Sequence, residues 1–167
     1  MAVSRKQFLS LATVSSVGML VPGKWNQSTA QQKDNQKPDP LDKELVKEFV
    51  IQGHRDLGRV QEMYTLQPGF LNVSWDWGGG DFETALEGAG HMGRKDIAQF
   101  LLDNGARLNI FCAAMLGKIE IVKSILTAMP ELKNSKGPHG LKLIHHATKG
   151  GEEAAAVLGY LKSIGAS

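Results

Sequence analysis

The chain has 167 residues, about the length of one domain, and 42% of them are hydrophobic while 22% are charged. This is the composition of a soluble globular protein, and it excludes wholesale disorder. The single cysteine, Cys112, excludes an intrachain disulfide framework and a multi-cysteine zinc site. The formal net charge is +2, and the first thirty residues hold three basic side chains and no acidic one. The remainder is nearly neutral, so we expect no binding of nucleic acid.

Residues 1–30 have the pattern of an export signal peptide. A basic start, residues 1–6, precedes an uncharged stretch, residues 7–23, and residues 28–30 offer small side chains for cleavage after Ala30. The uncharged stretch is too short and too rich in serine to be a good membrane span. We therefore expect an exported, periplasmic protein with no stable membrane anchor after cleavage.

Arg5, Lys6, Phe8 and Leu9 resemble the twin-arginine export motif, with Lys6 in place of the second arginine. If that route is used, the resemblance implies a bacterial protein that folds before export. The general secretory route remains an alternative. So does a retained or mitochondrial N-terminus, because the segment is rich in serine and free of acids.

The polar segment of residues 31–40 contains two prolines and is typical of a linker. Asp42 follows it and precedes a helical pattern, where it can cap the first helix. The folded domain is therefore expected over residues 41–167.

One short phrase recurs in this domain: a glycine, two variable residues, an acid and an apolar residue. The glycine permits a left-handed turn that ends one helix, and the acid suits the first turn of the next. An apolar stripe at helical spacing follows each phrase, and a shorter apolar helix precedes it. The four copies begin at Gly53, Gly93, Gly117 and, more loosely, Gly150.

These residues resemble the ankyrin repeat, a helix opening on T-P-L-H-x-A, a glycine turn and a second helix ending near G-A-x-x-N. Residues 84–109 are the clearest copy, and the resemblance covers residues 41–167. The chain also resembles a group of small exported bacterial ankyrin proteins, through residues 75–81, 91–94 and 113–117. The resemblance implies an all-α ankyrin-repeat solenoid of about four helix–turn–helix pairs with irregular finger loops.

The spacing of the copies is uneven, and a regular ankyrin repeat has about 33 residues. The first interval is long, which predicts an extended finger loop at residues 72–81. The second is short, which predicts that the finger at residues 109–110 is missing. A last finger is expected at residues 135–140, where Pro138 and two glycines favour a turn.

Trp75, Asp76, Trp77 and Asp81 in the long finger, with His139 in the last one, are the candidate partner-binding residues. Exposed aromatic side chains are frequent anchors at protein interfaces. The alternative is that both tryptophans pack the finger onto the helices, glycines 78–80 form its turn, and Asp81 caps the next helix.

The histidines are expected to have structural roles. A metal site would gather His139, His145 or His146 with Glu152 or Glu153, but no helical His-x-x-x-His or Glu-x-x-His spacing is present. His145 stands where the ankyrin signature has its own histidine, which braces a finger. We therefore expect neither a metal nor a cofactor.

The sequence contains no catalytic triad or phosphate loop, and Cys112 is expected to be a buried small hydrophobe. We expect no catalytic residue and a monomeric, non-enzymatic module that binds a protein partner through finger loops and first helices. A dedicated chaperone or inhibitor of one partner would have the same surface.

The alternative is an enzyme or small-ligand binder. It would be built on the candidate residues of the long finger together with His91. It requires a concave pocket and a carboxylate or histidine with a shifted pKa.

Overall fold

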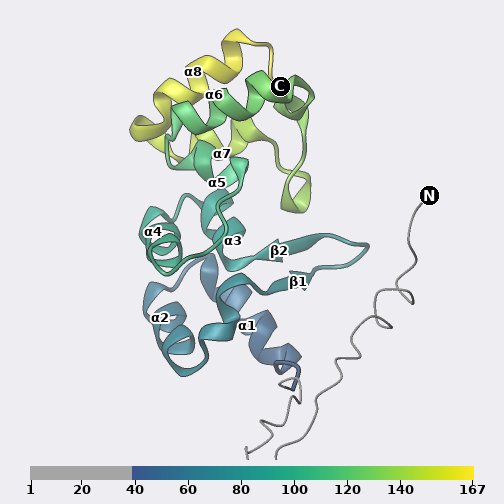
Figure 1. Cartoon of the computed structure of the whole chain (residues 1–167), viewed down its shortest axis with the longest axis vertical. Helices are drawn as coiled ribbons and strands as arrows, with labels where there is room; N and C mark the ends of the chain where they lie inside the picture. Colours follow the sequence, from purple (N-terminus) through teal and green to yellow (C-terminus); the bar gives the residue numbers. More distant parts are fainter. Residues whose placement is uncertain (1–38) are drawn as a thin grey trace, which may run out of the picture. The chain divides into compact units, whose positions relative to one another are not determined.

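Eight α-helices account for most of residues 39–167, the part of the chain that the computed structural model describes (Figure 1). They follow one another as four pairs, so the predicted all-α character is confirmed, with one small sheet as the exception. No helix within these residues combines enough length and hydrophobicity to cross a bilayer. The pairs are α1 (Lys43–Gly53) with α2 (Leu57–Leu66), α3 (Ala85–Met92) with α4 (Lys95–Asp103), α5 (Ile110–Met115) with α6 (Ile119–Ala128), and α7 (Leu143–Lys149) with α8 (Ala155–Ser163).

The described part forms one compact unit that begins at Asp39. The export motif (Arg5, Lys6, Phe8 and Leu9), the cleavage position after Ala30 and most of the linker lie outside the described residues. The expectations about export therefore stay predictions.

Side-chain caps begin the first two helices. Asp42 Oδ1 accepts hydrogen bonds from the backbone N–H groups of Glu44 and Leu45, which confirms the predicted cap of α1. Asp56 Oδ1 accepts one from the N–H of Arg59 and caps α2 in the same way.

Helix α3 begins with a capping box. Thr84 Oγ1 accepts a hydrogen bond from the N–H of Glu87, and the Glu87 carboxylate accepts one from the N–H of Thr84. The prediction that Asp81 caps this helix is therefore wrong. Strand β2 lies between Asp81 and the helix, which places the Asp81 side chain too early to reach the first turn.

The first helices of the pairs, α1, α3, α5 and α7, pack in succession against one another, and each packs against the second helix of its own pair. The second helices turn their apolar stripes inward: Ile97 and Leu101 of α4, and Val157 and Leu161 of α8, have no exposed surface. The core therefore follows the stack of helices as two neighbouring clusters of buried residues.

The four repeated glycines all lie close to neighbouring backbone, but only two of them have the predicted conformation. Gly93 and Gly117 have φ angles of 77° and 68°, the left-handed conformation that the repeated phrase predicts. That prediction is wrong for Gly53, which lies inside α1, and for Gly150, with a φ of −69°. At Gly53 and Gly150 a Cβ atom would collide with the backbone of a neighbouring first helix. These two glycines allow the first helices to approach closely.

The connection between the first two pairs is the longest structured one. A 3₁₀ turn, η1 (Pro68–Asn72), leads into an antiparallel hairpin of β1 (Ser74–Asp76) and β2 (Phe82–Thr84). In Figure 1 this hairpin reaches outward beside α1 and α3. The predicted extended finger is thus a two-stranded one.

The other connections are shorter. Residues 104–109 join α4 to α5 without a strand, which confirms that the second finger is missing. Between α6 and α7 lie η2 (Pro130–Asn134) and η3 (Pro138–Gly140), and one bridge joins Lys136 to Lys142. A further 3₁₀ turn, η4 (Gly151–Ala154), precedes α8.

Candidate functional site

The β1–β2 hairpin, residues 74–84, has one face toward the helices and one toward solvent. Trp75 pairs with Glu83 across the strands, and Asp76 pairs with Phe82. Because side chains alternate along a strand, Trp75 and Glu83 share one face while Phe82 lies on the other. Glu83 has no exposed surface, whereas Phe82 is 58% exposed. The face that carries Glu83 is therefore the one packed on the helices.

The tip of the hairpin is held by Asp76. Its Oδ1 atom accepts hydrogen bonds from the N–H groups of Gly78 and Gly80, at 2.8 and 3.2 Å. Residues 78–80 all have positive φ angles, which glycine adopts without steric cost. The predicted turn role of these glycines is confirmed.

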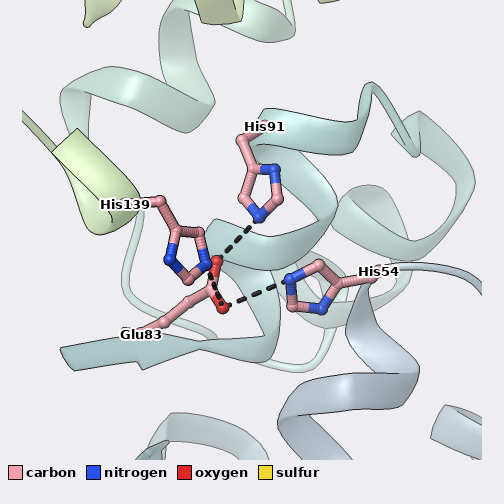
Figure 2. Close-up of side chains that lie close together, drawn as sticks. All are labelled: His54, Glu83, His91 and His139. Carbon is pink, nitrogen blue, oxygen red and sulfur yellow. Dashed lines mark hydrogen bonds and ion pairs between the residues drawn. The ribbon is translucent and has the colours of Figure 1, made fainter. Parts of the chain in front are cut away.

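Three histidines converge on the carboxylate of Glu83 (Figure 2). Nε2 of His91 lies 2.9 Å from Oε1, and Nε2 of His54 and of His139 lie 3.2 and 3.3 Å from Oε2. The indole N–H of Trp77 donates a hydrogen bond to Oε2, at 2.8 Å. We call His54, Glu83, His91 and His139 the histidine–glutamate cluster. Its members come from the end of α1, from β2, from α3 and from η3, so it joins segments that are far apart in the sequence.

Two of these histidines are also held by their second ring nitrogen. Nδ1 of His54 lies 2.9 Å from the carbonyl oxygen of Val50, and Nδ1 of His139 lies 2.9 Å from the carboxylate of Asp81. The backbone N–H of His139 donates to the same carboxylate. Both oxygens can only accept, so each Nδ1 carries a proton and donates it. The Nε2 atom of each ring is left to face Glu83.

Local structure places the histidine rings. Gly88 of α3 leaves room for the His54 ring, because a Cβ atom there would lie 2.7 Å from it. His139 has a φ of 57° and is the one non-glycine residue with positive φ among the described residues. Such backbone conformations are uncommon and tend to occur at functional sites. His91 lies in the last turn of α3 and is only 8% exposed.

The charge of Glu83 is stabilised by its neighbours. Burial alone raises the pKa of Glu83, but the neighbouring His54 and His91 rings and the hydrogen bond from Trp77 outweigh burial and hold this pKa well below its usual range. Burial alone lowers the pKa of His54, while the contact with Glu83 and the Val50 carbonyl raise it, and the net shift is upward. The Glu83 carboxylate is therefore ionised in the folded protein.

The structure brings together three of the five candidate residues from the sequence. Trp77, Asp81 and His139 meet at the cluster. Asp76 lies at the tip of the hairpin, and Trp75 is half-buried beneath Lys47, whose Nζ lies 5.3 Å from the ring centroid. Both tryptophans thus contact the rest of the fold, and Trp77 keeps 37% of its surface exposed.

The remaining histidines have other partners. Nε2 of His145 lies 3.0 Å from the backbone carbonyl oxygen of His91, so His145 braces α3 and not a finger loop. Nδ1 of buried His146 lies 2.9 Å from the carbonyl oxygen of Lys142. Glu153 pairs with Lys95 at 2.9 Å, away from the grouping considered in the sequence.

Cys112 is fully buried in α5. Burial raises the pKa of its thiol to about 12, so the thiolate that a nucleophile needs is disfavoured. The expected role as a small hydrophobe agrees with this position.

Sequence reasoning missed Glu83, the centre of the cluster. Its partners are distant in the chain, and no local spacing connects residues 54, 83, 91 and 139. One signal was present: in a hairpin that turns at residues 78–80, alternation places positions 81 and 83 on the face of the two tryptophans.

The hollows near the cluster are open. One of about 240 Å³ is lined by Ile51, His54, Arg55 and Trp77. A hollow of about 360 Å³ lies elsewhere, between the start of α1 and the end of α2, where apolar side chains such as Leu45 and Leu66 line it and no cluster member does.

Comparison with models of protein families, with curated proteins and with solved structures gives no match.

Proposed function

We propose that this protein is an exported, ankyrin-like helical repeat that binds a protein partner without catalysing a reaction, and that the β1–β2 hairpin is its main contact. The single observation that carries the proposal is Phe82, a large apolar side chain that is 58% exposed on a finger with a firmly held base. Aromatic side chains of this kind anchor many protein interfaces.

The anchoring of the hairpin supports the proposal. On the helix-facing side, Glu83 is buried under three histidines and Trp77, while Asp81 is bonded to His139. A loop that is ordered before binding loses little conformational entropy when the partner arrives. Phe82 can therefore contact a partner with little loss of conformational entropy.

The arrangement of the helices supports the ankyrin-like assignment. Four helix pairs with successively packed first helices, and connections that extend as fingers, are features that the resemblance implies. Repeat proteins of this type offer extended surfaces to their partners.

The test is affinity capture from periplasmic extract of the producing bacterium, with the full chain as bait. We expect one protein to be captured by the wild type and lost with Phe82→Ser. Leu66→Ser is the matched control, because Leu66 is 77% exposed at the end of α2, outside the hairpin. Equal capture by wild type and Phe82→Ser, or no capture by a folded bait, would contradict the proposal.

A second candidate function is the binding of a small ligand beside the cluster. The ionised, buried Glu83 and the open hollow lined by His54 and Trp77 favour it. A thermal-shift screen of small anionic and cationic metabolites tests it, and a hit has to lose its effect in Trp77→Phe to support this site.

A further inference from the structure

We propose that the histidine–glutamate cluster is a binding site for one divalent first-row transition-metal ion, with Zn²⁺ the best match, and that the ion fastens the hairpin to the helices. This inference rests on the cluster alone and does not depend on the proposed protein binding.

The donor set is the first argument. Three imidazole nitrogens and one carboxylate oxygen are ligands that Zn²⁺ accepts, and four is its usual coordination number in proteins. One ligand atom from each of the four residues lies within 4.8 Å of all the others. Bonds of about 2.0–2.1 Å in a tetrahedron hold ligand atoms about 3.3 Å apart. The distances from Oε2 of Glu83 to Nε2 of His54 and of His139, 3.2 and 3.3 Å, are already close to this value, while Nε2 of His91 lies 2.9 Å from the other carboxylate oxygen, Oε1.

The orientation of the rings is the second argument. Because His54 and His139 donate their Nδ1 protons outward, each ring in its neutral form aims the Nε2 lone pair at Glu83. A histidine that binds a metal is usually held in this way, through a bond from its other nitrogen to a carbonyl or carboxylate. Val50 and Asp81 supply those two acceptors here.

The unpaired atoms are the third argument. Oε1 of Glu83 and Nε2 of His91 are buried, and although they lie 2.9 Å apart, neither makes an aligned hydrogen bond within the described part of the chain. An unsatisfied buried polar atom carries a free-energy cost. A cation between these atoms would satisfy both lone pairs at once.

The charge balance agrees with this assignment. Without a cation, Nε2 of His54 and of His139 faces the Glu83 carboxylate favourably only if it carries a proton in addition to the one on Nδ1, which would place two positive rings beside Glu83. One divalent ion replaces those protons and leaves the rings neutral. His54 and His139 are partly exposed, so the ion can enter from their side.

The ion would connect four segments of the chain. Its ligands come from the end of α1, from β2, from α3 and from η3, that is, from the first two helix pairs, the hairpin between them and the connection between the third and fourth pairs. With all four positions taken by protein atoms, the site is of the closed, structural kind.

The test uses the full chain made without a polyhistidine tag and stripped with a chelator that is then removed. Calorimetric titration with ZnCl₂ should show one ion bound per chain, with a Kd of about 1 µM or tighter. Glu83→Gln and His91→Gln should each weaken binding about 100-fold, and Asp81→Asn about 10-fold, because it only orients His139. His145→Gln is the matched control: it removes a histidine, keeps a donor for the His91 carbonyl, and should bind as the wild type does.

A measurement on the wild type alone guards against variants that fail to fold. Co²⁺ bound at this site should show the intense visible bands of tetrahedral coordination, and Zn²⁺ should displace it. The absence of binding by folded wild type, the weak bands of octahedral Co²⁺, or an equal loss of affinity in His145→Gln would each overturn the proposal.

Discussion

Two buried histidines, His91 in the hairpin region and His146 in the C-terminal half, differ in what surrounds them. Both lie near the end of a first helix, α3 and α7, and both are almost completely buried. His91 faces the carboxylate of Glu83 at 2.9 Å, whereas His146 packs against the ring of Phe111, with centroids 5.1 Å apart. Burial alone therefore does not determine the role of a histidine. The groups that contact its ring determine that role.

The largest effect is expected from removing the Glu83 carboxylate, which distinguishes the surroundings of His91 from those of His146. Glu83→Leu should lower the free energy of unfolding by about 3–5 kcal/mol, because the histidines and the Trp77 N–H lose their acceptor inside the fold. Urea unfolding in the presence of a chelator measures this effect without any metal. Glu152→Leu is the control, since this exposed carboxylate should change stability by less than about 0.5 kcal/mol. A similarly small change for Glu83→Leu would show that the cluster does not hold the hairpin.

The pH dependence of stability tests the second histidine, His146, whose ring packs against Phe111. Burial, with smaller contributions from His145 and His91, lowers the pKa of His146 to about 4, against a weaker upward effect of the Lys142 carbonyl. The unfolded chain takes up this proton near pH 6.5, so it binds more protons than the folded protein at any pH between 6.5 and 4. The free energy of unfolding should therefore fall by about 3 kcal/mol as the pH drops through this window, and the titration of His146 should change it no further below pH 4.

His146→Leu should remove this part of the pH dependence. The measurement is urea unfolding of both proteins at several pH values between 7 and 4, with chelator present. The difference between wild type and variant is diagnostic, because the other groups titrate in both. Parallel stability curves for the two proteins would show that His146 is not held neutral.

The smallest expected effect concerns the space around His54. In Gly88→Ala the new methyl group would lie 2.7 Å from the His54 ring, so the ring has to move away from Glu83, at a cost of about 1–3 kcal/mol. Gly159→Ala is the matched control, since this glycine of α8 has open space around it. The control should gain about 0.5–1 kcal/mol, from the better helix propensity of alanine. Urea unfolding measures the change in the free energy of unfolding for both variants, and the two changes should have opposite signs. An increase in stability in both variants would mean that the His54 ring can be displaced freely.

Much of the fold could be read from the sequence because its signals are local. The apolar stripes after Gly53, Gly93, Gly117 and Gly150 place the second helices, and Asp42 marks the start of the first. The three consecutive glycines at residues 78–80 favour a turn, because glycine adopts positive φ angles without steric cost. Two wrong predictions have non-local causes. Gly53 is not a left-handed turn, and its lack of a side chain leaves room for the neighbouring helix α3. Asp81 does not cap a helix, and its carboxylate pairs with His139, which is far along the chain.

By itself the sequence determined four pairs of helices, their approximate limits and an extended finger between the first two. These follow from hydrophobic periodicity, capping residues and turn residues, which act within a few positions of the chain. Only the tertiary structure decided that His54, Glu83, His91 and His139 meet. The stacking of the helix pairs and the docking of the hairpin and of η3 bring these residues together. Such contacts depend on packing between elements that are distant in the chain, which no local sequence pattern records. Glu83 is the clearest case, because its three histidine neighbours approach it only in the folded chain.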